Sequence, residues 1–197
     1  MPADAMNCAA LVLAAGRGTR FGSDKRLARL PSGQTLLAAT LARAFEHFAS
    51  VAVVLRPGED AQQLGVDAGA RVIRAEQAGQ DMGASLAAGI AALQATPAQA
   101  VAVLLGDMPW IALGTLQQLT AQASSDRIVV PMHQGQRGHP VIFGRAFWPA
   151  LAQVQGDQGG RQVILDHPQA CVRVEVEDPG VVQDIDTPDQ LARSLPQ

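Results

Sequence analysis

The stretch LVLAAGRGTRFG at residues 11–22, followed by Asp24 and Lys25, decides the fold. It begins as an apolar strand and runs directly into a glycine-rich loop that carries Arg17 and Arg20. Glycine lets the backbone turn its N–H groups toward a phosphate, and neighbouring cations neutralise the phosphate charge. The stretch therefore predicts a strand followed by a phosphate-binding loop.

Two well-known phosphate-binding loops fit this stretch poorly. Phe21 stands where the dinucleotide fingerprint GxGxxG has its third glycine, and no GK[ST] follows for a P-loop. The second apolar run ends on Leu55 and Arg56, where a dinucleotide-binding fold has an acidic residue. A Rossmann dehydrogenase is thus an alternative that the sequence disfavours.

Short apolar runs alternate with segments of helical period along the chain. We expect strands at 8–14, 51–55, 71–74, 101–105 and 127–131, and helices along the apolar stripe from Leu37 to Phe48, at 84–94 and at 113–123. The polar segment 132–138 before the apolar run 140–143 predicts a hairpin insertion. Nearly continuous apolar strands suit a buried sheet, so we expect an α/β fold with a mostly parallel, Rossmann-like sheet and helices on both faces.

The composition argues against several classes of protein. No apolar run approaches the roughly 20 residues of a membrane-spanning helix. The N-terminus carries an acid and no basic residue before the first apolar run, unlike a secretory signal, so we expect a cytoplasmic protein. A net charge of −3 argues against a nucleic-acid-coating surface. Cys8 and Cys171 lie outside any metal-binding spacing and are better explained as small buried side chains.

The charges are unevenly distributed along the chain. Five of the fifteen basic residues lie between Arg17 and Arg29, opposed only by Asp24, which indicates an anionic ligand. Lys25 is the only lysine, either by chance composition or because a compact ammonium is needed at a phosphate. Six acids and no basic residue lie between Glu175 and Asp189, as a solvated face or a metal site.

Two acidic motifs follow predicted strands. In GDMP (106–109), Asp107 is placed to bind a magnesium ion at a triphosphate, although a plain strand-to-helix turn also uses Asp and Pro. In DID (184–186), an extended backbone puts both carboxylates on one face and Ile185 in the core, while Thr187 can cap a following helix. In parallel sheets ligands bind beyond the carboxyl ends of the strands, so the loops after 14 and 105 and the segment 182–185 should converge.

Taken in order, these motifs resemble the molybdenum cofactor cytidylyltransferase family. The resemblance rests on LAAGxGxRFGxxK (13–25), GDMP (106–109), RGHPV (137–141), GDxGGR (156–161) and DIDTP (184–188), and it covers residues 13 to 191. It implies one nucleotidyltransferase domain over residues 1–197 that moves CMP from CTP to the terminal phosphate of molybdopterin, with Mg2+ as cofactor and pyrophosphate as product. It also implies a molybdoenzyme as recipient of the product, and no nucleic acid or membrane partner.

The family's site residues carry over to matching positions of this chain. The resemblance implies that Lys25, Asp107 and Arg20 are catalytic and that Asp107 and Asp186 bind the metal. It places the nucleotide against Leu13, Ala14, Ala15, Gly16, Arg17, Gly18, Lys25 and Ser85, and the acceptor against Arg137, His139 and Arg161. Ser85 is equally well explained as a helix N-terminal cap, and His139 as an ordinary hairpin residue. Asp81 stands where the family has glycine, which puts the contacts to the base in question.

Three other functions remain open on sequence grounds. A related guanylyltransferase would use GTP, but such relatives typically have Gly at the position of Ala15. A nucleotidyltransferase could act on another phosphorylated acceptor, such as a sugar phosphate or a small isoprenoid precursor. A non-catalytic chaperone could bind the nucleotide or cofactor, but the presence of both Asp107 and Asp186 counts against a pure binder.

Overall fold

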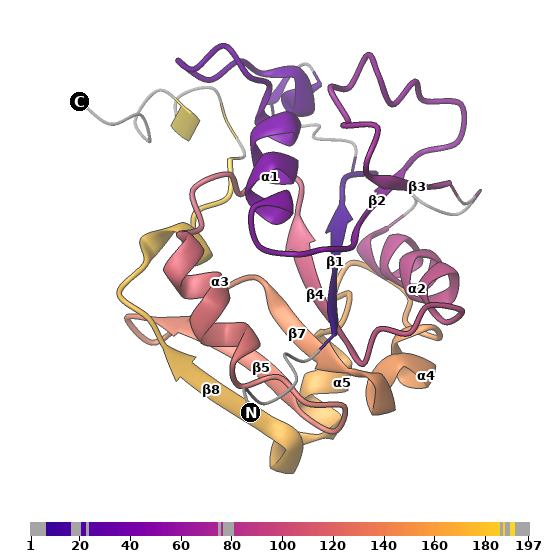
Figure 1. Cartoon of the computed structure of the whole chain (residues 1–197), viewed down its shortest axis with the longest axis vertical. Helices are drawn as coiled ribbons and strands as arrows, with labels where there is room; N and C mark the ends of the chain where they lie inside the picture. Colours follow the sequence, from indigo (N-terminus) through magenta and orange to yellow (C-terminus); the bar gives the residue numbers. More distant parts are fainter. Residues whose placement is uncertain are drawn as a thin grey trace.

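The computed structural model describes residues 7–16, 21–22, 24–74, 76, 81–185, 187 and 190–191. Within them, one sheet of eight strands crosses the molecule (Figure 1). Its first half is parallel and consists of β1 (Cys8–Leu13), β2 (Val51–Leu55), β3 (Arg71–Arg74) and β4 (Ala100–Leu105). β1 pairs with β2 on one side and with β4 on the other, and β3 extends the sheet beyond β2. The carboxyl ends of β1 and β4 therefore lie side by side.

The second half of the sheet contains the predicted hairpin insertion. It consists of β5 (Ile128–His133), β6 (Gln136–Arg137), β7 (Val141–Gly144) and β8 (Cys171–Glu175). β5 turns into β6 through Gln134 and Gly135, whose φ angles of 50° and 79° are typical of a two-residue hairpin. β7 runs antiparallel between β4 and β5, and β8 pairs parallel with β5.

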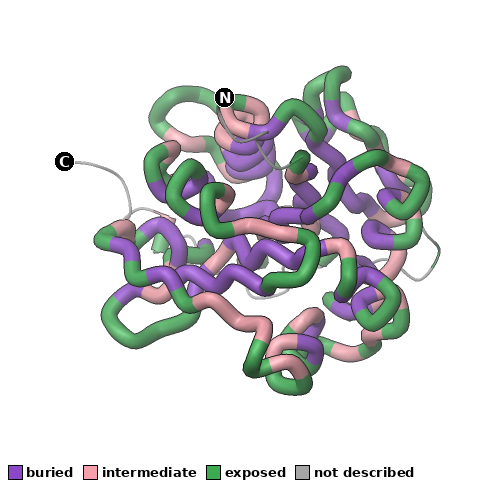
Figure 2. The backbone as a smooth tube through the Cα atoms, turned by 60° about the horizontal axis from the view of Figure 1, so that its bottom comes forward, coloured by how far each residue is buried: buried purple, intermediate pink, exposed green. Residues whose placement is uncertain are grey.

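Helices cover both faces of the sheet, as predicted. α1 (Leu36–Phe45) and α3 (Leu113–Thr120) bury Leu41 and Leu116 in one apolar cluster. On the other face, α2 (Met82–Leu93), α4 (Trp148–Leu151) and α5 (Arg161–Asp166) contribute to a second cluster. Figure 2 shows buried residues (purple) running through the interior, with exposed segments (green) around them. No helix among the described residues is long and apolar enough to cross a membrane.

The predicted elements are confirmed with shifted ends, and three elements were missed. β1 ends at Leu13, α1 ends at Phe45 rather than near Phe48, and α3 ends at Thr120. β8, α4 and α5 were not predicted. Only Val174 of β8 is buried, and the charged Arg173 and Glu175 alternate with its valines, so β8 is not a continuous apolar run. α4 and α5 are four and six residues long, too short to display a helical period.

Candidate functional site

Three segments that are distant in sequence meet beyond the carboxyl ends of β1 and β4. Lys25 begins the short 3-10 helix η2 (Lys25–Leu27), and its Nζ donates to Asp107 Oδ2 at 2.6 Å and to the carbonyl oxygen of Ile185 at 3.1 Å. The first loop, the loop after β4 and the late acidic segment therefore converge, as predicted from strand order.

Asp107 is held tightly against the first loop. The N–H of Gly106 donates to Leu13 O at 3.0 Å, and a Cβ added at Gly106 would lie 3.1 Å from Ala14 Cβ, so the approach depends on glycine. The Asp107 side chain is almost buried. Burial raises its pKa, the charge and hydrogen bond of Lys25 lower it, and the charge of Asp184 raises it again, leaving the pKa above its ordinary value. A cation between these carboxylates would relieve their repulsion, and carboxylate oxygens are preferred ligands of Mg2+.

The late acidic segment is anchored on both sides of Asp184. Asp178 Oδ2 accepts hydrogen bonds at 2.8 Å from the N–H of Ala112 and from Thr115 Oγ1, which fixes the segment to the start of α3. Ile185 is fully buried, as the extended DID segment predicts. Thr187 and Gln190 cap each other: Gln190 N donates to Thr187 Oγ1 at 3.2 Å, and Thr187 N donates to Gln190 Oε1 at 2.9 Å. Asp186, the second predicted metal ligand, lies outside the described residues.

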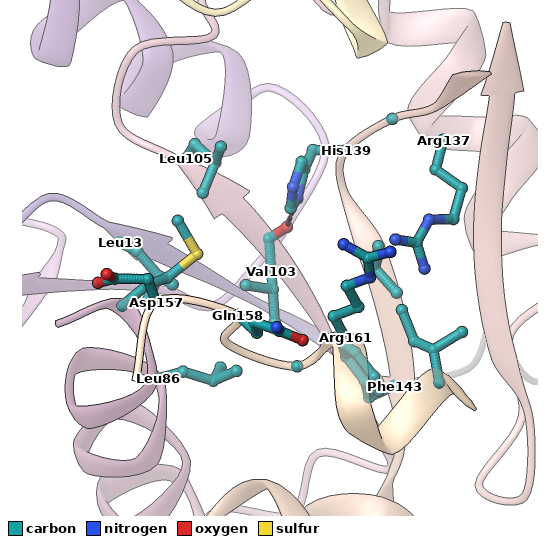
Figure 3. Close-up of a pocket in the computed structure, with 15 residues that line it drawn as sticks. Leu13, Leu86, Val103, Leu105, Arg137, His139, Phe143, Asp157, Gln158 and Arg161 are labelled. Carbon is teal, nitrogen blue, oxygen red and sulfur yellow. Dashed lines mark hydrogen bonds between the residues drawn. The ribbon is translucent and has the colours of Figure 1, made fainter. Parts of the chain in front are cut away.

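A cavity of about 280 Å³ opens beside this meeting point (Figure 3). Apolar residues from β1, β4, β7, α2 and α5 form much of its wall: Leu13, Leu86, Val103, Leu105, Val141, Phe143 and Ile164. Its polar lining includes Arg137, His139, Asp157, Gln158 and Arg161. The cavity can therefore hold a small molecule with an apolar body and polar substituents.

The segment between β6 and β7 forms part of the cavity wall through Gly138 and His139. β6 and β7 both pair antiparallel with β5; between them Gly138 N still donates to Pro131 O of β5 at 2.9 Å, whereas His139 and Pro140 lie outside the strands. There the N–H of His139 donates to Val181 O at 2.7 Å, and a Cβ on Gly138 would lie 2.4 Å from the same oxygen. The RGHP segment thus packs directly on the residues that precede Asp184.

His139 lies between the cavity and the carboxylates. Its ring Nδ1 is 3.4 Å from Val103 O, in hydrogen-bonding range, and the ring lines the cavity. Burial lowers the pKa of His139, whereas the charges of Asp107 and Asp184 oppose this shift; the pKa stays below its ordinary value. The imidazole is therefore neutral at physiological pH, with one ring nitrogen able to accept a hydrogen bond.

Arg137 on β6 and Arg161 at the start of α5 form a cationic edge of the cavity. Both line the cavity, and the view of Figure 3 draws their side chains on one side of it and Asp157 on the other. Neither arginine has a salt bridge to any residue that the structure describes. Guanidinium groups that line a cavity are well suited to bind a phosphate or carboxylate.

The start of α2 closes another side of the cavity. Asp81 is the N-cap, and its Oδ1 accepts from Ala84 N at 2.7 Å, so this carboxylate has a structural role. Gly83 N donates to Gly156 O at 2.9 Å, which joins the helix to the GDxGGR loop. Ser85 is buried and its hydroxyl donates to Asp81 O at 3.2 Å; it does not line the cavity.

The other predicted nucleotide contacts surround the end of β1. Leu13 lines the cavity, Ala14 and Ala15 are buried, and Gly16 is exposed. Arg17, Gly18 and Arg20 lie outside the described residues.

The basic cluster at 17–29 was expected to face an anion, and for Arg26 this is wrong. Arg26 is buried and binds the protein's own carboxylates, Asp24 and Glu59. Glu59 was not predicted to belong here, because it lies 33 positions from Arg26 in the sequence. Its one signal in the sequence is a carboxylate shortly after Arg56, which follows the second strand.

Residues 10–171 match the model of the MobA-like NTP transferase domain. The chain belongs to this family. This confirms the resemblance seen in the sequence, and the chain is a nucleotidyltransferase of the MobA-like type.

Two curated relatives of this MobA-like chain are similar over nearly their full length. It is 25% identical to the molybdenum cofactor cytidylyltransferase of Escherichia coli, over 95% of this chain and 94% of that one. It is 29% identical to the nicotine blue oxidoreductase of Paenarthrobacter nicotinovorans, over 94% and 95%.

Solved structures agree with this fold. The crystal structure of an Rv0371c homologue from Mycobacterium sp. strain JC1 superimposes with a TM-score of 0.83 at 30% identity, covering 95% of this chain and 94% of that chain. Rv0371c of Mycobacterium tuberculosis in complex with manganese gives a TM-score of 0.76 at 28% identity, over 96% and 98%.

Proposed function

We propose that this chain transfers CMP from CTP to the terminal phosphate of molybdopterin or of the molybdenum cofactor, with Mg2+ as cofactor. Residues 1–197 act as one domain in the cytoplasm and pass the product to a molybdoenzyme. The observation that carries the proposal is the 2.6 Å contact between Lys25 and Asp107 beside a cavity edged by two arginines.

The reaction needs no protein nucleophile. An oxygen of the acceptor phosphate, already anionic, attacks the α-phosphorus of CTP. The bond from that phosphorus to the oxygen bridging to the β-phosphate breaks, and pyrophosphate leaves with the electron pair. Catalysis then depends on aligning the two substrates and on offsetting the charge of the phosphates.

The residues around Lys25 fit these two tasks. Lys25, Arg17 and Arg20 contribute positive charge at the phosphates, and the backbone of Ala14 to Gly18 lines the nucleotide. Asp107 and Asp186 hold the metal, which when bound orients the phosphate oxygens and offsets their charge. Asp107 is suited to this because its buried carboxylate, beside the charge of Asp184, is stabilised by a cation.

The nucleotide preference rests on Ala15. Its side chain is 1% exposed and packs in the apolar cluster on the α2 face, so this methyl group affects the nucleotide through the packing and backbone path of the first loop. A cytidylyltransferase among the relatives supports CTP over GTP. A methyl group in a closely packed wall is worth about 1–3 kcal/mol of discrimination.

The acceptor occupies the cavity in this proposal. A ring system packs against the apolar wall, Arg137 and Arg161 bind its anionic group, and His139 accepts a hydrogen bond where the cavity meets the carboxylates. Ser85 supports the nucleotide side indirectly, through the start of α2.

The test is pyrophosphate release by the purified protein with Mg-CTP and molybdopterin. We expect release with CTP and much less with GTP at equal concentration. Faster release with GTP would move the chain to the guanylyltransferases, and release with a sugar phosphate instead of molybdopterin would replace the acceptor. Absence of pyrophosphate with every nucleoside triphosphate and acceptor would overturn the proposal.

A further inference from the structure

Arg26 follows Lys25 in sequence but points the opposite way. The Lys25 side chain reaches Asp107, whereas the Arg26 side chain is only 5% exposed and enters the protein beneath the first loop. A buried guanidinium is costly unless its charge and its donors are all satisfied. The acceptors of the Arg26 guanidinium therefore indicate which parts of the structure this side chain holds in place.

Every N–H of the Arg26 guanidinium has an acceptor. The group has five donors. Nε donates to Asp24 Oδ1 at 2.8 Å, Nη1 donates to Ala14 O at 2.8 Å and to Glu59 Oε2 at 2.9 Å, and Nη2 donates to Asp24 Oδ2 and to Glu59 Oε1. Only a planar fork can satisfy this arrangement, and a lysine ammonium, with three donors, cannot.

These partners are the two ends of the predicted phosphate-binding loop. Ala14 is the first residue after β1, and Asp24 directly precedes Lys25. Glu59 provides a fixed point outside the loop, because its carboxylate also accepts from Arg56 N and Arg56 Nε, each at 2.8 Å. Arg26 thus fastens both ends of the loop to the segment that follows β2.

The bond to Ala14 also orients a peptide plane. Ala14 N donates to Val54 O at 3.1 Å, while its carbonyl accepts from Arg26. Because a trans peptide is planar, directing the Ala14 carbonyl toward Arg26 directs the N–H of Ala15 the other way. Ala15 is among the residues whose backbone lines the nucleotide in the proposed function.

We infer that Arg26 is a positioning residue for nucleotidyl transfer, which sets the Ala14–Ala15 peptide and the place of Lys25 without touching the nucleotide. The inference rests on the proposed function only in that the first loop binds a nucleoside triphosphate. Buried ion pairs add little net stability compared with apolar replacements, so the geometry that Arg26 imposes is its main contribution.

The test replaces Arg26 by lysine, which keeps the charge and removes the fork. We expect Arg26→Lys to weaken Mg-CTP binding, measured by calorimetry, about tenfold and to lower kcat about tenfold or more, because displacement of Lys25 by about 1 Å misaligns the reaction. Arg43→Lys, on α1, is the matched control and should leave both values unchanged, since among the described residues Arg43 forms its salt bridge with the exposed Glu46 alone.

A second variant tests the ion pair between Arg26 and Glu59 by changing Glu59 instead. Glu59→Gln should weaken Mg-CTP binding in the same direction, and its effect should not add to that of Arg26→Lys, because both act through one bonded group. Should Arg26→Lys fail to fold, Glu59→Gln decides alone. Wild-type affinity and kcat in the folded variants, whatever their stability, would overturn the inference. A wild-type protein that binds no Mg-nucleoside triphosphate would instead overturn the proposed function.

Discussion

At the scale of single residues, Lys25 is the strictest test of the site. Its Nζ donates both to Asp107, at 2.6 Å, and to the Ile185 carbonyl, at 3.1 Å. A compact ammonium fits between these two acceptors, whereas a wider guanidinium at the same position does not. Lys25→Arg should therefore lower the rate at saturating CTP by about 100-fold, while CTP affinity changes modestly because the charge is kept. Steady-state kinetics with CTP and molybdopterin measure both.

The control for Lys25→Arg is an arginine-to-lysine exchange at the protein surface. Arg127→Lys, at an exposed position before β5, should leave kcat and KM unchanged. If Lys25→Arg turned over at the wild-type rate, the solitary lysine would be an accident of an arginine-rich composition.

Replacing Asp107 should lower activity strongly and change the stability of the fold little. Its raised pKa means that the folded protein holds this proton more tightly than the unfolded chain does, so the fold loses stability as the pH rises through that pKa. Asp107→Asn removes the buried charge and should leave the free energy of unfolding at about pH 7 within roughly 1 kcal/mol of wild type, while pyrophosphate release falls about 100-fold or more. Urea unfolding and the release assay, run on one preparation, check both; substantial remaining activity at ordinary Mg2+ would remove Asp107 from the metal site.

At the scale of elements, the Arg26 cluster joins the first loop to the segment after β2 and predicts acid sensitivity. Hydrogen bonds from Arg26 lower the pKa of Asp24; burial alone would raise the pKa of Glu59, but the hydrogen bonds from Arg26 and Arg56 outweigh it and lower that pKa too. The unfolded chain therefore binds protons at Asp24 and Glu59 more tightly than the folded protein does. The stabilisation is therefore complete above the unfolded pKa values of about 3.9 and 4.3 and is lost as the pH falls through the folded ones.

Removal of one of these carboxylates should weaken the dependence of the free energy of unfolding on pH. Glu59→Gln should show a smaller fall in the free energy of unfolding between about pH 5 and pH 3 than wild type does. Glu46→Gln is the control, since the Glu46 side chain is 51% exposed in its pair with Arg43. Equal slopes for wild type and Glu59→Gln would show that the cluster does not contribute to acid stability.

The same elements show how far the sequence could predict the molecule. Apolar runs such as β2 and β4 are buried on both faces, so their composition alone identifies them. Lys25 and Asp107 could be predicted to meet because each follows the end of a parallel strand. The role of Arg26 could not be predicted, since a basic residue in a basic cluster has the same composition whether it faces a ligand or a buried Glu59. Nor could the cavity be predicted, because its lining residues come from strands, helices and loops that are far apart in the sequence.

At the scale of the whole molecule, the proposed function gives the site a nucleotide side and an acceptor side built from different parts of the chain. Ala15 and Lys25 follow β1 of the parallel half of the sheet, whereas Arg137 and Arg161 come from the insertion and from α5. His139 lies between them, and its pKa reflects charges from both sides, those of Asp107 and of Arg137. A molecule of net charge −3 thus holds a local cationic edge where an anionic acceptor would enter.

This division predicts that variants on the acceptor side change the KM for molybdopterin and not the KM for CTP. Arg137→Gln and Arg161→Gln should each raise the KM for molybdopterin about tenfold and leave the KM for CTP unchanged, because each removes one charged hydrogen-bonding partner from the acceptor alone. The KM for molybdopterin should also lose part of its salt dependence in these variants, since the attraction they remove is screened by ions. Arg173→Gln, an exposed charge on β8, is the control for net charge and should change neither KM. An equal rise in the KM for CTP would mean that the cavity holds part of the nucleotide, and the acceptor would then have to approach Lys25 and Asp107 from another side.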